Sequence, residues 1–350
     1  MRPHLALVPA ILVAAATIVA GRSGAIGNAF STWKAALSAT DVLALDAGAA
    51  VMQTLATPVR EELAYVGMVY VDAPTDRFID RFRNIVQFEH GPGVPQIGRF
   101  SDPPRIEDLE SLTLPATDVA ALAQCRPARC DVKLSAEAMR RFQDEVNWSG
   151  PNVVHQANIL MRAMILDLVA RYRADGNAAL GHYDDGAESL SVAEQFRAIL
   201  ASRDPLPVPV PALLTYLDGY PRGRPAGADE FFYWTVVDFG LKRTLRVNHV
   251  TIYPLAPGTA AGVAYVIAIK QLYASHYFHT TLELRFLADD DRHAGEHRMS
   301  LVSITRSRSD GMTGFKGLFL RPVISRRSRA AVRGYLEHVK QQVERPPETR

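Results

Sequence analysis

Hydrophobic and polar residues alternate with a period of two in the last third of the chain. Four runs rich in β-branched and aromatic residues occupy residues 243–253, 263–270, 272–287 and 299–306, and Gly, Pro and Asp clusters separate them. This pattern predicts successive antiparallel strands. A helical period follows over residues 328–343, where one face carries Val332, Leu336, Val339 and Val343. A sheet followed by one amphipathic helix is therefore expected at the C-terminal end.

The earlier part of the chain has mainly helical spacing. Residues 29–57 are rich in Ala and low in charge, which predicts one or two packing helices. Residues 63–71 predict a strand, and a Pro-containing turn leads from it into a helix over 76–86. Residues 135–217 predict a mainly helical insertion or lobe, with amphipathic segments at 136–146, 153–172 and 192–200 before an extended PLPVPVP segment.

These elements predict an α+β fold with an antiparallel sheet, a long C-terminal amphipathic helix and a helical insertion. Residues 65–82 and 243–343 together are similar to the helix-grip architecture of START-type lipid-binding domains, although they cover less than half of the chain and contain no diagnostic motif. The resemblance implies an apolar cavity between a curved sheet and the terminal helix, occupied by a lipid or another hydrophobic ligand.

The same elements suggest five segments. They are a signal peptide (1–25), an N-terminal helical segment (26–60), the first strand, helix and disulfide-loop region (61–134), the helical insertion or lobe (135–217), and the sheet with the C-terminal helix (218–350).

The N-terminus predicts export. A short basic region precedes sixteen uncharged residues at 5–20, and small residues at 23–25 fit cleavage near Ala25. The alternative is an uncleaved anchor, but sixteen residues are fewer than the roughly 20 that span a bilayer, and Pro9 interrupts them. No later segment is expected to span a membrane. The mature protein is therefore expected in the periplasm or outside the cell.

An oxidising compartment gives the two cysteines a role. Cys125 and Cys130 have four residues between them, including Pro127, which predicts a structural disulfide. A redox pair is the alternative, but the spacing is not Cys-x-x-Cys. The whole chain has 39 basic and 37 acidic residues, so no global charge favours nucleic-acid binding.

Candidate ligand-binding residues lie in the strand-rich region. They are His249, Tyr253, Tyr265, Tyr273, His276, Tyr277 and Phe278. If residues 272–286 form one strand, alternation places Tyr273 and Tyr277 on its more polar face, where they can line a pocket, and His276 and Phe278 on its apolar face. A hydrogen-bonded core histidine and ordinary cross-strand packing are the alternative interpretation.

No recognised catalytic signature is present, and neither a metal nor a cofactor is predicted. His276 and His279 would lie on opposite faces of a strand, which disfavours a metal pair. His182, Asp184 and Asp185 form the best remaining candidate for acid–base chemistry. A solvated loop is the alternative for that segment.

Basic residues are concentrated between positions 298 and 333, with nine against the single acidic residue Asp310. We expect an anionic surface to contact Arg306, Arg308, Arg326, Arg327 and Arg329. The alternative is a solvated cationic face that acidic residues elsewhere balance.

The sequence thus favours an exported protein that binds a hydrophobic or amphipathic small molecule, possibly a lipid, with peripheral contact to an anionic membrane surface. Two alternatives stay open. One is an exported enzyme that uses the same cavity, with His276, Tyr277 or residues 182–185 as acid–base groups. The other is an envelope interaction protein without a ligand.

Overall fold

The computed structural model describes residues 29–345, apart from 58, 60, 203–205, 207, 239, 241, 257–261, 290–297, 310–329 and 331. The expected signal peptide lies outside the described residues, as do Arg326, Arg327 and Arg329.

One eight-stranded sheet organises the described chain, with the strand order β1-β2-β10-β9-β8-β7-β6-β3. All neighbouring strands are antiparallel. The strands are β1 (Val51–Leu55), β2 (Glu62–Val71), β3 (Gln96–Arg99), β6 (Asp229–Val237), β7 (Thr244–Pro254), β8 (Val263–Ala274), β9 (Phe278–Asp289) and β10 (Met299–Ser309). The short strands β4 (His182–Tyr183) and β5 (Leu190–Ser191) form a separate pair. This sheet with its helices confirms the predicted α+β class.

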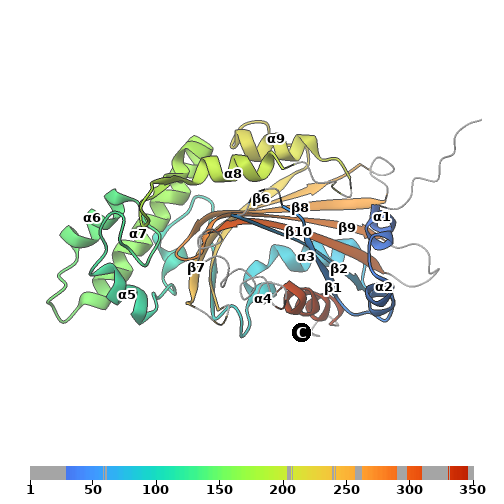
Figure 1. Ribbon diagram of the computed structural model, residues 1–350, viewed down its shortest axis with the longest axis horizontal. Helices are drawn as coiled ribbons and strands as arrows, with labels where there is room; N and C mark the ends of the chain where they lie inside the picture. The colour runs from blue at the N-terminus through green and yellow to red at the C-terminus, as the bar shows by residue number, and fades with distance from the viewer. Residues whose placement is uncertain are drawn as a thin grey trace, which may run out of the picture.

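Helices cover both faces of the sheet (Figure 1). α3 (Thr75–Arg83), α4 (Ile85–Glu89) and a helix over residues 332–344 pack on the face that carries Val69, Ile267 and Leu301, which we call the lower face. α8 (Val192–Leu200) and α9 (Pro211–Gly219) pack on the upper face, which carries Met68, Ala268 and Val302. α1 (Ala29–Ala35) and α2 (Ala39–Asp46) add their apolar side chains to the upper-face core.

The chain between β3 and β6 forms a helical region, whose part over residues 106–180 lies at one end of the sheet (Figure 1). It contains η1 (Ile106–Leu109), α5 (Ala116–Leu122), α6 (Ala136–Glu145), α7 (Val153–Asp175) and η2 (Gly176–Leu180), in addition to α8 and α9. Serine caps start two of its helices, since Ser135 and Ser191 accept hydrogen bonds from the backbone of the first turn. The apolar faces of α5, α6 and α7 share a core with Phe232, Trp234 and Leu245 of the sheet.

The helix that begins with α7 differs from expectation in one respect. By length and composition alone, Val153–Leu180 could cross a membrane, whereas the sequence analysis expected no such segment after the N-terminus. One side of α7, with Leu160, Ile165 and Val169, is buried in the core of the helical region. The core helix of a protein that crosses no membrane can have the same composition.

The predicted strands need two corrections. Residues 272–287 do not form one strand, because β8 continues to Ala274 and β9 begins at Phe278. The turn between them contains Tyr277 in the left-handed region, with φ 61°, so the expected alternation stops there. The sheet also contains three strands that the sequence analysis missed: β1 lies inside the segment predicted as helical over residues 29–57, and neither β3 nor β6 was predicted.

Candidate functional site

The lower face changes from apolar to polar along its strands. In β10, Met299 and Leu301 belong to the apolar core, and the alternate residues that follow are Ser303, Thr305, Ser307 and Ser309. In β9, Leu287 belongs to the same core, and the alternate residues before it are Arg285, Glu283 and Thr281. The register pairs Ser303 with Arg285 and Thr305 with Glu283. The polar residues of adjacent strands therefore form one continuous band.

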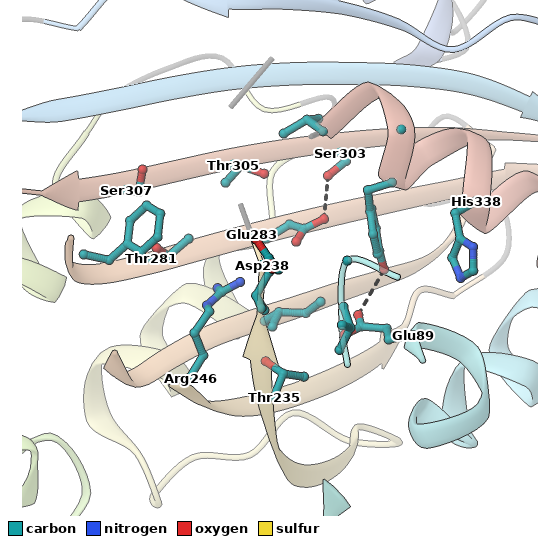
Figure 2. Close-up of a pocket in the computed structure, with 18 of the residues that line it drawn as sticks. Glu89, Thr235, Asp238, Arg246, Thr281, Glu283, Ser303, Thr305, Ser307 and His338 are labelled. Carbon is teal, nitrogen blue, oxygen red and sulfur yellow. Dashed lines mark hydrogen bonds between the residues drawn. The ribbon is translucent and has the colours of Figure 1, made fainter. Parts of the chain in front are cut away.

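A cavity of about 500 Å³ lies against this band, between the sheet, the helix over residues 332–344 and the loop at residues 91–94 (Figure 2). Its volume lies within the roughly 300–1,000 Å³ typical of small-molecule sites. The lining has an apolar part and a polar part. Apolar contacts come from Val94, Val237, Ile269, Phe278 and Val332, and hydroxyl or charged groups come from the polar band and from Glu89, Arg246 and Tyr335.

An ion pair between the buried Arg285 and the half-buried Glu283 forms part of the cavity wall. Arg285 is 2% exposed, and its Nε donates to Glu283 Oε1 at 2.7 Å. Ser303 Oγ donates to the same carboxylate oxygen at 2.7 Å. Burial raises the pKa of Glu283, but the Arg285 charge and these hydrogen bonds outweigh it and hold this pKa below its usual value. Glu283 is thus stabilised as a carboxylate inside the protein.

Glu89 of α4 is the second buried carboxyl group of the cavity. Its Oε1 accepts a hydrogen bond from the Tyr335 hydroxyl at 3.0 Å and lies 3.8 Å from Arg285 Nη2. Burial raises the pKa of Glu89 above its usual value, because the opposing attraction of Arg285 is smaller. The cavity therefore shifts the pKa values of two carboxyl groups in opposite directions.

Arg246 of β7 brings a second guanidinium to the cavity. Its Nε donates to Gln271 Oε1 at 3.0 Å, and its Cζ lies 6.0 Å from the centre of the Phe278 ring. Figure 2 shows the end of this side chain pointing from β7 into the cavity. Among the described residues, no carboxylate lies within ion-pair distance of Arg246. Asp238, at the rim, is instead paired with Arg243 at 3.2 Å.

Several buried polar atoms of the lining make no hydrogen bond to the described residues. They are the Tyr65 hydroxyl, the Ser309 hydroxyl and Arg285 Nη1. Buried polar groups normally have partners, since an unpaired one costs about 1–3 kcal/mol. Unused polar groups beside a cavity indicate a site that a polar ligand can complete.

The structure brings two of the predicted ligand-binding residues to this cavity. Tyr277 and Phe278 both line it, because the turn between β8 and β9 places neighbouring residues on the same side. Tyr265 also lies on the lower face but outside the lining, and its hydroxyl donates to Asp76 at 2.8 Å. The sequence analysis placed Tyr277 and Phe278 on opposite faces, which the turn overrides.

His249 and Tyr253 lie on the upper face, away from the cavity. His249 is fully buried, with Nδ1 at 3.2 Å from the Tyr172 hydroxyl and Nε2 at 3.1 Å from Glu230 Oε2. Burial lowers the pKa of His249, although Glu230 partly opposes this shift. Tyr253 packs against the upper-face core. The contacts of both residues are those of packing and internal hydrogen bonding.

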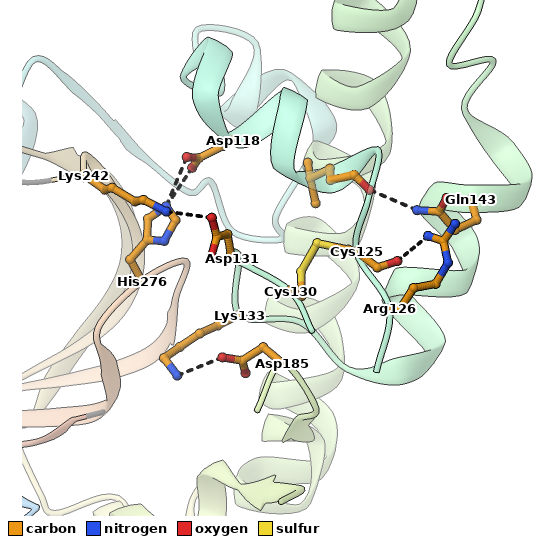
Figure 3. The surroundings of a disulfide bond; sticks show 11 residues. Asp118, Cys125, Arg126, Cys130, Asp131, Lys133, Gln143, Asp185, Lys242 and His276 are labelled. Atoms are coloured by element: carbon orange, nitrogen blue, oxygen red, sulfur yellow. Dashed lines mark hydrogen bonds and ion pairs between the residues drawn. A yellow bond between two sulfur atoms is a disulfide. The ribbon is translucent and has the colours of Figure 1, made fainter. Parts of the chain in front are cut away.

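Tyr273 and His276 lie at the end of the sheet, next to the helical region. The Tyr273 ring belongs to the core of that region. His276 is 4% exposed, and its Nε2 lies 3.0 Å from the buried Asp118 of α5 (Figure 3). This arrangement matches the alternative interpretation of His276 as a hydrogen-bonded core histidine, and it ties the turn after β8 to α5.

Asp184 and Asp185 contact the disulfide loop, since their backbone carbonyls accept hydrogen bonds from the N–H groups of Ala128 and Cys130. Figure 3 shows Asp185 beside this loop. Asp184 Oδ2 accepts from the backbone N–H of Ala136 at 2.7 Å, at the start of α6. Asp185 pairs with the buried Lys133 at 3.4 Å. The two carboxylates thus hold the start of α6 and the chain after Cys130, and neither lines the cavity.

The structure confirms the predicted bond between Cys125 and Cys130. Replacing both cysteines by Ser should lower the free energy of unfolding by about 2 kcal/mol, because the unfolded chain gains the freedom of an open loop. Chemical unfolding with and without reductant measures the effect, and reductant should destabilise only the unsubstituted protein. Two freely alkylated thiols in the non-reduced protein would contradict the prediction.

The predicted anionic-contact residues that the structure describes have internal partners. Arg306 is 7% exposed and forms an ion pair with the buried Glu62. Arg308 donates from Nε to Gln195 Oε1 of α8 at 2.6 Å. Arg308 is half-buried, and both guanidinium groups therefore have partners inside the protein.

The sequence analysis did not select Glu89, Arg246, Glu283, Arg285 or Tyr335. The signal for two of them was present, since alternation places Glu283 and Arg285 on the same polar face as Tyr277. The run of hydroxyl residues at every second position of β10 was a second signal. Glu89 and Tyr335 come from helices distant in sequence, and no local pattern connects them.

Among the described residues, no group of three or more His, Cys, Asp or Glu side chains could hold a metal ion. Comparison of the chain with protein-family models, with curated proteins and with solved structures found no match. A function for this chain must therefore be proposed from the geometry and the chemical groups of the lower-face cavity.

Proposed function

We propose that this protein binds an amphipathic small molecule in the cavity between the sheet and the helix over residues 332–344. The observation that carries the proposal is a cavity of about 500 Å³ with apolar side chains on one side and a band of hydroxyl and charged groups on the other. A ligand with an apolar body and a polar end would satisfy both parts of this lining.

The arrangement of the elements supports the helix-grip resemblance that we propose for this chain. A strand (β2) and two helices (α3 and α4) precede the sheet meander from β6 to β10, and a helix over residues 332–344 then packs on the lower face. The cavity lies between that helix and the sheet, where the START-type resemblance implies a ligand. The disulfide is consistent with the proposed export.

Alanine at either Tyr277 or Phe278 should weaken binding of a fluorescent fatty acid by about twofold to tenfold, because each change removes aromatic contact area from the cavity. Fluorescence titration measures the dissociation constant. Tyr253→Ala is the matched control, since this tyrosine packs on the upper face, and its binding should be unchanged. No change in either cavity variant, with all three proteins folded, would argue against binding at this site.

A second candidate function is acid–base catalysis in the same cavity. It is favoured by Glu89 and Glu283, whose pKa values lie above and below the usual value, because such a pair provides one proton donor and one acceptor. Native mass spectrometry of protein from its own compartment separates the two functions. A carrier retains its ligand unchanged on incubation, whereas an enzyme converts it.

A further inference from the structure

The polar groups of the cavity that lack partners are mainly hydrogen-bond donors. Arg246 uses Nε for Gln271, and its two terminal nitrogens have no hydrogen bond to the described residues. Arg285 Nη1 and the hydroxyls of Tyr65 and Ser309 also lack partners among these residues. Guanidinium nitrogens only donate, and hydroxyls can do so. What this side of the cavity lacks is a hydrogen-bond acceptor.

The acidic groups of the cavity, in contrast, already have partners. Glu283 accepts from Arg285 and Ser303, and Glu89 accepts from Tyr335. Asp238 accepts from Arg243 and from the backbone of Gly240. Each of these described carboxylates thus already accepts at least one hydrogen bond, whereas the terminal nitrogens of Arg246 donate none, so the arrangement favours an acidic ligand over a basic one.

The charges lead to the same conclusion. Arg285 is neutralised by Glu283 at 2.7 Å, and Asp238 by Arg243 at 3.2 Å. Glu89 lies 3.8 Å from Arg285 Nη2 and accepts a hydrogen bond from Tyr335. Arg246 interacts with the charges of Glu89 and Glu283 at longer range, but its terminal nitrogens have no carboxylate of the described lining within ion-pair distance. A half-buried guanidinium beside a cavity attracts an anion more strongly than one in open water.

We propose that the ligand is an amphiphile with a single carboxylate, which Arg246 binds while the apolar part lies against Ile269, Val94 and Val332. This inference rests on the proposed binding function and specifies the ligand's polar end. A carboxylate matches one guanidinium in charge and accepts two parallel hydrogen bonds from it. A phosphate monoester carries nearly two negative charges at neutral pH, and the described lining offers no second unpaired cation for it.

The test compares four probes that share one alkyl chain: dodecanoate, dodecanol, dodecyl phosphate and dodecylamine. Each displaces the neutral dye Nile red from the full mature protein at neutral pH. The unsubstituted protein should bind dodecanoate about tenfold or more tightly than dodecanol, as expected for a charge-assisted hydrogen bond. Arg246→Gln should bring this ratio close to one by weakening dodecanoate binding alone.

Two further variants separate the role of Arg246 from changes in folding and net charge. Arg246→Lys keeps the charge and should retain a several-fold preference for dodecanoate, although it loses the bidentate geometry. Arg171→Gln removes the same charge from α7, where Arg171 is exposed and pairs with Asp167, and should leave the ratio unchanged. Thermal unfolding of each variant shows that the comparison is between folded proteins.

Three results would overturn the carboxylate assignment. They are equal binding of dodecanol and dodecanoate by the unsubstituted protein, a preference that survives Arg246→Gln, and tighter binding of dodecyl phosphate or dodecylamine than of dodecanoate. In each of these cases the amphiphile still binds, so the proposed function stands. If none of the four probes displaces the dye and none binds in direct calorimetry, the proposed function itself fails, together with the assignment that rests on it.

Discussion

Replacing Arg285 by Met should destabilise the protein at neutral pH by about 3–5 kcal/mol, the usual cost of leaving one partner of a buried ion pair without the other. Arg285 is 2% exposed, and its Nε lies 2.7 Å from Glu283 Oε1. The Met side chain fills most of the space between the rings of Phe82 and Tyr335, which now flank the guanidinium. The loss therefore comes mainly from the charge that remains on Glu283.

The pH dependence identifies that cause. With Arg285 present, the pKa of Glu283 lies below its usual value. The ionised Glu283 therefore stabilises the folded protein at a pH above this usual value, and the stabilisation disappears as the pH falls through the lowered pKa. Without Arg285, only the Ser303 hydrogen bond and the charge of Arg246 oppose burial. The pKa of Glu283 should therefore rise, and the variant gains stability relative to the unsubstituted protein as the pH falls towards about 4.5. Urea unfolding at neutral and acidic pH measures both effects.

Arg285→Met combined with Glu283→Gln is the matched control for this prediction. The double variant leaves no buried charge at the pair, so it should be more stable at neutral pH than Arg285→Met alone. If the single variant were as stable as the unsubstituted protein, the ion pair would not hold this part of the cavity wall. A destabilisation that does not change with pH would assign the loss to packing.

The parts of the fold that the sequence predicted depend on local patterns. The residues 243–253 and 299–306 correspond to β7 and β10, and three predicted helical segments correspond to α6, α7 and α8. Cys125 and Cys130 are close in sequence, so spacing alone was enough to predict their bond. In each case the information lies within a window that a helix turn or a strand spans.

The turn between β8 and β9 shows why the rest could not be predicted. Residues 275–277, Ser-His-Tyr, contain neither Gly nor Pro, so no local turn signal interrupts the run 272–287 that was predicted as one strand. The chain nevertheless turns there, with Tyr277 at φ 61°. Its hydroxyl accepts the backbone N–H of Lys242 at 2.9 Å, and His276 contacts Asp118 of α5. Contacts distant in sequence therefore accompany a conformation that the local residue types do not favour.

The candidate site has the same dependence on distant contacts. Glu89 and Tyr335 are separated by 246 positions, and they meet only because α4 and the helix over residues 332–344 pack on the same face. Period-two alternation could place Glu283 and Arg285 together on a polar face. It could not show that this face is covered, and burial is what turns a polar face into a site with shifted pKa values.

A buried amine on the other face of the sheet allows a prediction of opposite sign, namely a substitution that stabilises the protein. Lys270 of β8 is fully buried on the upper face, where its Nζ contacts Asn177 Oδ1, the Leu217 carbonyl at 3.4 Å, and the Phe196 ring at 3.8 Å from its centre. No described carboxylate lies within ion-pair distance. Burial holds the pKa of Lys270 well below its usual value, so the folded protein binds this proton less readily than the unfolded chain does.

Lys270→Met should therefore stabilise the protein by about 1–3 kcal/mol at neutral pH, since it removes the cost of burying the amine and loses about 1 kcal/mol of hydrogen bonding. In the unsubstituted protein, burying Lys270 costs no charge-related stability above its usual pKa of 10.5, where the amine is uncharged in both the folded and the unfolded protein. As the pH falls below this value, the unfolded chain takes up the proton more readily and the folded protein loses stability. The advantage of the variant should accordingly shrink between neutral pH and about pH 10.5.

Lys133→Met is the matched contrast. Lys133 is 4% exposed and pairs with Asp185, so its replacement should destabilise the protein. Urea unfolding of both variants and of the unsubstituted protein across this pH range measures the differences in the free energy of unfolding. A Lys270→Met protein that is less stable by the same amount at every pH would show that the contacts of the amine outweigh the cost of its burial.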